Sequence, residues 1–318
     1  MSPSPPVTVV LLTYKRGEEL VRCLRSLLAQ DYRPLQIVVV DDGSGDETPE
    51  IARRALADAP EGIEWRVEEH ERNRGIGPAR NTGIAAATGE FIAFTDDDCV
   101  ARPDWVTELV RPFDGAPDIA VTGGGIDEPE DPTWVQRAAE GISFLGTTER
   151  DVVSCVGCNM AYRASFLAEH PFDPTAQYAD ELDRCFRAAA EGFRVRFVPK
   201  ARVTHYHRRT LRAFLRQQYM RGQGSVWVRR KHGGNFWPVK NWGTLLFLLG
   251  VAALAVFPGR WGAAAAVAGT AIWVAMIFYL DLSRGKSPAV TIATLPLLAL
   301  GYLSEFAGAT SRAVRGAG

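Results

Sequence analysis

The chain has 318 residues, which is enough for one large domain or for a domain with an appendage. Its formal net charge of −1 at pH 7 gives no overall attraction to nucleic acid, so no nucleic-acid partner is expected. Its five cysteines are an odd number in a long chain and do not resemble a disulfide framework, and the CxxC pair of Cys155 and Cys158 has no second ligand pair to indicate zinc.

Strands and helices alternate over the first hundred residues. A β-branched run at residues 7–12 predicts a strand; it is too short for a cleavable signal peptide and follows prolines rather than basic residues. Leucines at helical spacing predict a helix over residues 18–29. The same reasoning predicts strands at 37–40, 63–67 and 91–94 and helices at 50–56 and 78–87. This alternation is typical of a mostly parallel, doubly wound α/β sheet, whose ligands bind beyond the carboxyl ends of the strands.

Polar side chains stand at several of these carboxyl ends. Thr13 follows the first strand, Asp41 and Asp42 follow the second, and three consecutive aspartates, 96–98, follow the strand at 91–94. Like charges this close repel one another unless a cation or hydrogen-bond donors are near. Asp96 and Asp98 share one side of an extended segment, and Mg2+ and Mn2+ prefer oxygen ligands. The pattern therefore predicts a divalent metal site; the alternative is a solvated acidic turn, and for Asp41 and Asp42 a cap of the next helix.

The second half of the chain is less regular. Strands are predicted at 119–123, within 152–162 and at 195–198, and helices at 134–145 and 178–191. Residues 210–228 form an arginine-rich amphipathic stretch, which suits a helix on an anionic membrane face or near phosphates. A merely solvated basic face is the alternative.

Three apolar runs follow, at residues 244–257, 261–280 and 289–306. About 20 apolar residues span a bilayer; the middle run meets that length, the first is short, and the third is compatible with spanning or with an interfacial position. Basic residues before the first run predict a multi-pass protein of the cell membrane whose large N-terminal domain is cytoplasmic. A buried pair of helices in a soluble protein is the alternative. The predicted organisation is an α/β domain at 1–207, an interfacial segment at 208–240, two or three transmembrane helices within 241–309 and a tail at 310–318.

Several short motifs occur together in a characteristic order. They are VVLLTY at 9–14, IVVVDDGS at 37–44, NRG at 73–75, ARNTG at 79–83, GEFIAFTDDD at 89–98, GCNMAYR at 157–163 and DELD at 180–183. In this combination the chain resembles the family-2 glycosyltransferases of the GT-A fold. The resemblance implies a metal-dependent enzyme that uses a nucleotide sugar and inverts the anomeric centre by single displacement.

The resemblance also implies roles for individual residues near the donor. Thr13, Tyr14 and Asp42 would hold the nucleotide base, with Asp42 accepting from a ring N–H of uracil. Arg80 would reach the diphosphate, and a surface salt bridge is the alternative for this residue. Asp97 would contact the ribose. The metal, Mn2+ or Mg2+, would be held by Asp98, with Asp96, which is also expected to contribute to nucleotide binding, close by. His205 would complete the metal shell or contact the diphosphate; a structural histidine is the alternative.

The catalytic base is expected in the DELD motif. The family pattern is Glu-Asp with the Asp as base; here the two are swapped, so Glu181 aligns with the base and Asp180 is the alternative. The resemblance places Cys158, Asn159, Gln218 and Arg221 on the acceptor side. Gly222 stands where the QxxRW signature of processive synthases has Trp, which argues against long-chain processivity.

The predicted function is transfer of a sugar from a nucleotide sugar, with a UDP-sugar favoured, to a hydroxyl group of a lipid-linked or cell-surface glycan acceptor. Such a reaction belongs to polysaccharide biosynthesis at the cell envelope. One alternative is a non-catalytic subunit that binds a nucleotide sugar or scaffolds a membrane glycan-assembly complex. A nucleotidyltransferase is disfavoured because no glycine-rich phosphate loop with a trailing Lys follows the first strand.

Overall fold

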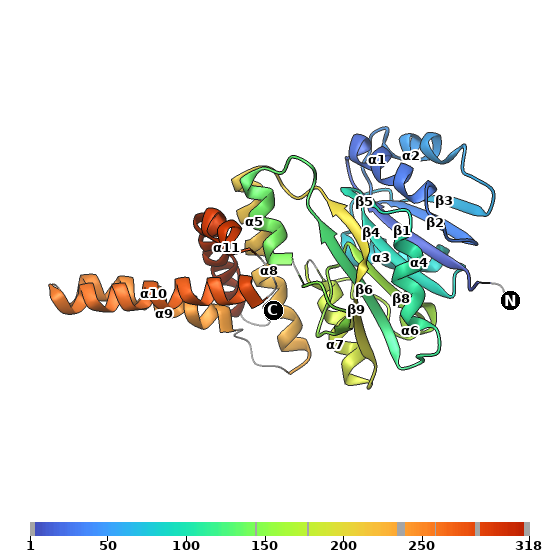
Figure 1. The fold of residues 1–318 in the computed structure, drawn as a ribbon. Helices are drawn as coiled ribbons and strands as arrows, with labels where there is room; N and C mark the ends of the chain where they lie inside the picture. Colours follow the sequence, from blue (N-terminus) through green and yellow to red (C-terminus); the bar gives the residue numbers. More distant parts are fainter. Residues whose placement is uncertain are drawn as a thin grey trace. The chain divides into compact units, whose positions relative to one another are not determined.

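The computed structural model describes residues 4–143, 145–176, 178–233, 239–257, 259–283 and 287–314 (Figure 1). The chain forms two compact units. The first contains residues 1–129 and 145–206, and the second contains residues 130–144 and 207–318. The second unit therefore includes a segment, residues 130–144, that the sequence prediction assigned to the α/β domain.

A nine-stranded sheet forms the centre of the first unit, with the order β3-β2-β1-β4-β8-β6-β9-β5 and with β7 paired to β9 (Figure 1). The strands are β1 (Val7–Thr13), β2 (Leu35–Asp41), β3 (Ile63–Glu69), β4 (Phe91–Asp96), β5 (Cys99–Ala101), β6 (Ile119–Asp127), β7 (Arg150–Asp151), β8 (Asn159–Arg163) and β9 (Arg194–His205). Strands β3, β2, β1 and β4 are parallel to one another. Strand β8 then runs antiparallel between β4 and β6, so the sheet is parallel in its first half and mixed in its second.

Helices cover both faces of this sheet. They are α1 (Gly17–Leu28), α2 (Thr48–Leu56), α3 (Ile76–Ala86), α4 (Trp105–Val110), α6 (Ala164–Glu169) and α7 (Asp180–Ala190), with a 3-10 turn at Arg111–Phe113. One core cluster contains the leucines of α1 and Trp105 of α4. A second cluster contains Ala79 of α3 and Cys185 of α7. Side chains of β1 and β2 alternate between the two clusters, as expected for strands buried on both faces.

Strand β9 is longer than the sequence predicted. Residues 199–201 bulge out of the ladder, because Gly124 of β6 pairs with Val198 and the next residue, Gly125, pairs with Arg202. A bulge lets a strand accommodate a proline such as Pro199, which cannot donate to the ladder. The strand resumes and ends at His205, which pairs with Cys99 of β5. This pairing brings His205 next to the triple aspartate.

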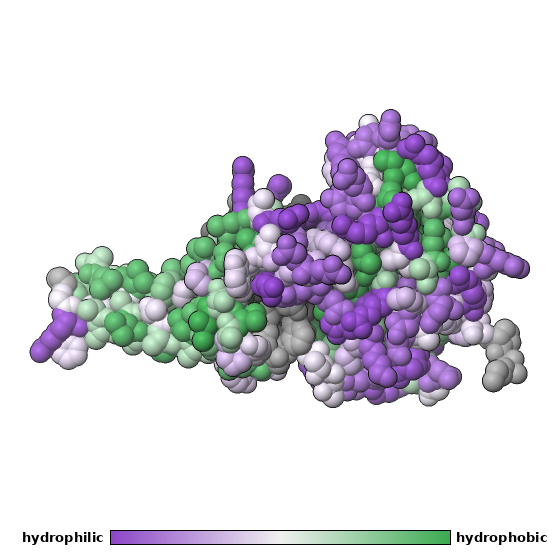
Figure 2. All heavy atoms as spheres, turned by 45° about the horizontal axis from the view of Figure 1, so that its top comes forward, coloured by the Kyte–Doolittle hydropathy of each residue, from purple (hydrophilic) through white to green (hydrophobic). Residues whose placement is uncertain are grey.

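The second unit is helical, with α5 (Trp134–Ser143), α8 (Leu211–Lys231), α9 (Val239–Val256), α10 (Arg260–Ser283) and α11 (Pro288–Val314). Helices α10 and α11 are long and apolar enough to cross a membrane, and α9 is a shorter apolar helix. Figure 2 shows apolar side chains over the surface of the α9–α10 pair. These two helices approach closely at Gly250 and Gly269, where a Cβ would lie 2.7 Å and 2.8 Å from backbone oxygens of the partner helix, as is common between membrane helices.

Gly222 has a packing role in this unit. A Cβ at Gly222 of α8 would overlap the carbonyl oxygen of Glu305 in α11, and a Cβ at Gly308 of α11 would overlap the carbonyl oxygen of Tyr219. The two helices therefore cross with their backbones in contact. A tryptophan at position 222, as in the QxxRW signature, has no room in this crossing.

Candidate active site

The predicted polar residues converge because three parallel strands end at the same edge of the sheet. Thr13 at the end of β1 is in register with Asp41 at the end of β2, and Leu12 is in register with Asp96 at the end of β4. Strand β5 then pairs with β9, which adds His205 to the same edge. The strand-end reasoning from the sequence thus agrees with the observed topology.

Asp97 and Asp98 turn toward the loop that follows β1. The Thr13 hydroxyl donates to Asp97 Oδ2 at 3.0 Å, and Arg16 Nη1 lies 2.9 Å from Asp97 Oδ1 and 2.7 Å from Asp98 Oδ2. Burial raises the pKa of Asp97 to about 7, although Arg16 opposes this shift. The sequence analysis did not single out Arg16. Its position, two residues beyond Tyr14 at the mouth of the first strand, was the available signal.

Asp98 and His205 face one another. Asp98 Oδ1 lies 3.1 Å from His205 Nε2, and both side chains are buried. Burial alone would raise the pKa of Asp98, but His205 and Arg16 hold it well below its usual value. Burial would lower the pKa of His205, but Cys99 and Asp98 raise it to about 10.

A divalent cation of the kind that the resemblance implies fits this pair. Two donor atoms on one ion at about 2.1 Å each, at right angles, lie about 3.0 Å apart, which matches the separation of Asp98 Oδ1 and His205 Nε2. A carboxylate and an imidazole are donors that Mn2+ accepts. Asp96 is half-buried. Burial raises the pKa of Asp96, and the nearby negative charge of Asp98 raises it further. The residues that could hold such an ion are therefore Asp98, His205 and Asp96.

Asp41 and Asp42 organise the loops beside this edge. Asp41 accepts hydrogen bonds from the backbone N–H (2.9 Å) and the hydroxyl of Ser44, as a turn cap does. Asp42 accepts from the N–H groups of Arg74 and Gly75, at 2.9 Å and 2.8 Å. Asp42 Oδ1 also lies 2.7 Å from His70 Nδ1. These three contacts hold the loop at residues 70–75 in place. They leave one of about four acceptor positions on the Asp42 carboxylate for a further hydrogen bond. The sequence analysis did not single out His70.

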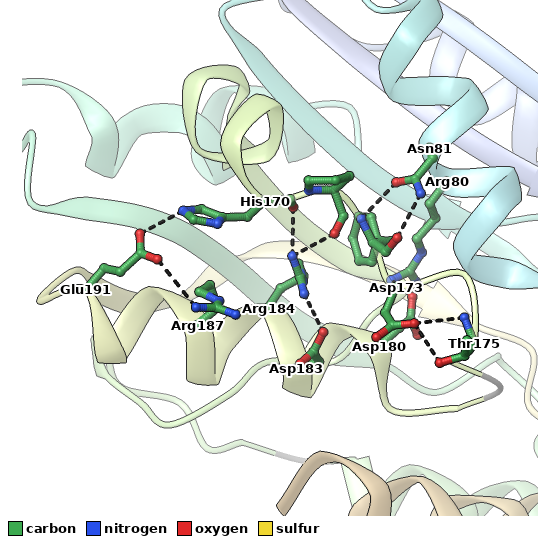
Figure 3. Close-up of polar contacts among 12 residues, drawn as sticks. Arg80, Asn81, His170, Asp173, Thr175, Asp180, Asp183, Arg184, Arg187 and Glu191 are labelled. Atoms are coloured by element: carbon green, nitrogen blue, oxygen red, sulfur yellow. Dashed lines mark hydrogen bonds and ion pairs between the residues drawn. The ribbon is translucent and has the colours of Figure 1, made fainter. Parts of the chain in front are cut away.

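Arg80 and Asp180 form a buried ion pair (Figure 3). Arg80 Nη1 lies 2.6 Å from Asp180 Oδ2, and the two side chains are 3% and 2% exposed. The guanidinium group also lies over the rings of Phe94 and Phe172, with its carbon 5.3 Å and 5.0 Å from their centroids. From the sequence, Arg80 was expected either to reach the diphosphate or to form a surface salt bridge. In the structure Arg80 is buried, and its charge is matched by Asp180.

Neighbouring contacts fix the first turn of α7 (Figure 3). This turn contains Asp180 and Glu181. Arg184 pairs with Asp183 and donates to the carbonyl oxygens of His170 and Pro171 at 2.7 Å and 2.8 Å. Half-buried Glu181 packs beside Gly157, where an added Cβ would lie 3.4 Å from the Glu181 carboxyl carbon. Of the two candidate bases, Asp180 is engaged in a buried ion pair and Glu181 is the more exposed.

The residues assigned to the acceptor side are in different surroundings. Asn159 is fully buried: its Nδ2 donates to the carbonyl oxygens of Gly125 and Ala201 at 2.8 Å and 3.0 Å, and its Oδ1 accepts from Trp105 Nε1 at 2.8 Å. These bonds join β8, β6 and β9, so we leave Asn159 out of the acceptor site. Cys158 is also buried, beside His205. Gln218 and Arg221 lie on α8 in the second unit, the former buried and the latter half-buried.

Comparisons with known proteins agree with this arrangement. The chain matches the model described as glycosyl transferase family 2 over residues 8–170, and that of glycosyl transferase family group 2 over residues 91–303. A Haloferax volcanii protein named glucosyl-dolichyl phosphate glucuronosyltransferase is 30% identical over 222 residues, which cover 63% of this chain and 68% of that protein. A Mycobacterium tuberculosis protein named pre-mycofactocin glycosyltransferase is 29% identical over 289 residues, or 81% of this chain and 59% of that protein.

The fold is also found among solved structures. The mannosyltransferase PcManGT from Pyrobaculum calidifontis, solved in complex with GDP-Man and Mn2+, superposes with a TM-score of 0.63 at 21% identity, covering 99% of this chain and 91% of that one. The likeness confirms the GT-A fold predicted from the sequence. With half of the chain matched by the family model, the protein is a member of glycosyl transferase family 2, an enzyme of the glycosyltransferase class.

Proposed function

We propose that the enzyme transfers a sugar from a nucleotide sugar, with a UDP-sugar favoured, to an acceptor hydroxyl group in a metal-dependent reaction that inverts the anomeric carbon. One observation carries the proposal: the carboxylates of Asp97 and Asp98 connect Thr13 on one side with His205 on the other. The side chains that we propose to bind the base and the metal therefore lie at one edge of one sheet. Ligands of doubly wound sheets bind at such edges.

The donor would be held by residues that follow the first, second and fourth strands. Tyr14 is 41% exposed and offers its ring to the base, Asp42 offers its remaining acceptor position to a ring N–H, and Asp97 accepts from the ribose. Asp98 and His205, with Asp96, would hold Mn2+ or Mg2+. When bound, such an ion supplies Lewis-acid stabilisation of the negative charge on the leaving diphosphate.

Glu181 is the proposed general base. A carboxylate oxygen of Glu181 takes the proton from the acceptor hydroxyl while that hydroxyl oxygen forms a bond to the anomeric carbon. The bond from the anomeric carbon to the diphosphate oxygen breaks in the same step, and the nucleoside diphosphate leaves. One positioned base that assists attack opposite the leaving group makes a single displacement, so the configuration inverts.

The acceptor is proposed to be a lipid-linked or cell-surface glycan. Helices α10 and α11 have the length and composition of membrane spans, and α8 ends in three consecutive basic residues, which suits the cytoplasmic face of a membrane. The Haloferax volcanii relative carries a dolichyl phosphate in its name, in keeping with a lipid acceptor. We accordingly propose that the protein crosses the membrane more than once and that its sheet unit lies in the cytoplasm. Its binding partners would be nucleotide sugars and the membrane.

The test uses the purified full-length chain in detergent with a panel of UDP-, GDP- and dTDP-sugars. The expected result is Mn2+- or Mg2+-dependent release of a nucleoside diphosphate, which EDTA abolishes and added metal restores. Asp98→Asn and Glu181→Gln should each lower the rate by at least about 100-fold, whereas Glu169→Gln, whose side chain is 79% exposed, should leave it unchanged. Release of pyrophosphate, or full activity in EDTA, would contradict the proposal.

A further inference from the structure

A second group of possible metal ligands shares His205 with the Asp98–His205 pair. Cys99 Sγ, Cys158 Sγ and a ring nitrogen of His205 lie within 4.8 Å of one another, and all three residues are buried. The chain brings them together from distant segments: Cys99 begins β5, His205 ends β9 opposite to it, and Cys158 directly precedes β8. The CxxC spacing contributes nothing to this group, because Cys158 belongs to one core cluster and Cys155 to the other.

The separations are close to those that zinc requires. With Zn–S bonds of about 2.3 Å and a Zn–N bond of about 2.05 Å, tetrahedral angles place sulfur and nitrogen ligands about 3.6 Å apart. Cys158 Sγ and His205 Nδ1 are 3.7 Å apart. Two sulfurs on one zinc ion lie about 3.8 Å apart, so Cys99, at most 4.8 Å from the others, has to move by about 1 Å at most.

The two ring nitrogens of His205 face different partners. Nδ1 faces the sulfur of Cys158, and Nε2 faces the carboxylate of Asp98. This is the arrangement of metal-binding histidines in general, in which one nitrogen binds the ion and the other donates to a carboxylate that fixes the ring. We propose that Cys99, Cys158 and Nδ1 of His205 form a site for a thiophilic divalent cation such as Zn2+, distinct from the oxygen-rich position at Asp98.

Occupancy of this site would act on the neighbouring one, a consequence that rests on the proposed function. Binding replaces the thiol protons of Cys99 and Cys158 and the proton on Nδ1 of His205, and all three are released to solvent. A neutral His205 bound through Nδ1 carries its remaining proton on Nε2, where it donates to Asp98. Nε2 then has no lone pair for Mn2+, so Zn2+ at the thiol site inhibits metal-dependent transfer without taking the place of Mn2+.

The chain provides matched controls for the thiol ligands. Cys155 and Cys185 are buried in the second core cluster and lie close together, because the Cys155 backbone is hydrogen-bonded to the Cys185 thiol. Neither belongs to the three-residue group. Replacing them tests whether any pair of buried thiols in this chain binds zinc or only the pair beside His205.

The binding test needs no glycosyl transfer. Purified full-length protein, reduced and stripped of metal, is titrated with Zn2+ against a chromophoric chelator and separately with Co2+, whose bonds to thiolate give a charge-transfer absorption in the near ultraviolet. We expect one tightly bound ion per chain with the thiolate band. Cys99→Ser and Cys158→Ser should each weaken binding by more than about 100-fold, since even a partner that only orients a ligand contributes 10–100-fold. Cys155→Ser and Cys185→Ser should bind as the parent does.

Three results would overturn the site. The first is binding without the thiolate band, which would place the ion on the carboxylates. The second is equal binding by parent and Cys99→Ser proteins that unfold at the same temperature, and the third is the absence of binding. If binding is as expected, the parent enzyme should be inhibited by Zn2+ at constant excess Mn2+ and Cys99→Ala should resist inhibition at least 10-fold better. Zinc binding without any transfer activity would count against the proposed function alone. Absence of binding in an active enzyme would count against this site alone.

Discussion

The substitution Asp180→Asn tests whether the carboxylate of Asp180 has a structural role, in contrast to the catalytic role proposed for Glu181. Asp180 is the ion-pair partner of Arg80, at 2.6 Å, and both side chains are almost completely buried. The amide group that replaces the carboxylate keeps the shape of the side chain but removes its negative charge, so the guanidinium group of Arg80 loses its buried counterion. Glu181, the next residue, is half-buried.

The cost can be estimated from the surroundings of Arg80. Removing one partner of a buried ion pair destabilises a protein by about 3–5 kcal/mol. The rings of Phe94 and Phe172 under the guanidinium group offset about 1 kcal/mol of this loss. We expect Asp180→Asn to lower the free energy of unfolding by about 2–4 kcal/mol, which for a unit of this size lowers Tm by about 4–16 °C. Glu181→Gln should lower the free energy of unfolding by less than Asp180→Asn does, because Glu181 is only half-buried.

The assay combines thermal unfolding, followed by near-ultraviolet circular dichroism in detergent, with the transfer rate per folded molecule. Glu181→Gln should lose less in Tm than Asp180→Asn and at least about 100-fold in kcat. Asp180→Asn should lose stability and, at temperatures where it is folded, retain more activity than Glu181→Gln. The double variant Arg80→Met with Asp180→Leu should recover at least half of the lost stability, because apolar residues can replace a buried pair at little cost.

The opposite pattern would refute this reasoning. If Asp180→Asn unfolds at the parent's temperature but is inactive, while Glu181→Gln is active, then Asp180 is the base. In that case the buried pair with Arg80 would not contribute to stability.

Three further variants test other parts of the molecule. Tyr14→Ala should weaken nucleotide binding about 5- to 100-fold, the value of a stacked aromatic ring, without changing Tm, and Tyr14→Phe should bind normally; calorimetric titration with the nucleoside diphosphate checks this. Asn159→Ala should lower the free energy of unfolding by at least about 3 kcal/mol in urea titrations, because it orphans Trp105 Nε1 and two carbonyl groups; a loss under about 1 kcal/mol would contradict its structural role. Gly222→Trp should disrupt the α8–α11 crossing and lower the Tm of the full chain, whereas Arg216→Trp, at an exposed position of α8, should not.

Local patterns in the chain already predict most elements of the first unit. Alternating β-branched runs and amphipathic helices require a doubly wound sheet, because each element must bury its own apolar face. The same logic places Thr13, Asp42 and the aspartates 96–98 at one sheet edge, since parallel strands end together. The apolar helices α10 and α11 were predicted for the same reason: length and hydropathy are properties of a segment alone.

The partners of individual side chains depend on the sheet register and on packing across long sequence separations. Arg80 and Asp180 are 100 residues apart, and nothing local to either residue indicates that they pair. The bulge at residues 199–201 sets which residue of β9 meets Cys99, and thereby moves His205 beside Asp98. Cys155 and Cys158 read as one motif along the chain, yet the turn between them sends their thiols into different cores. Such pairings follow from the free energy of the whole packed sheet, so only the tertiary structure reveals them.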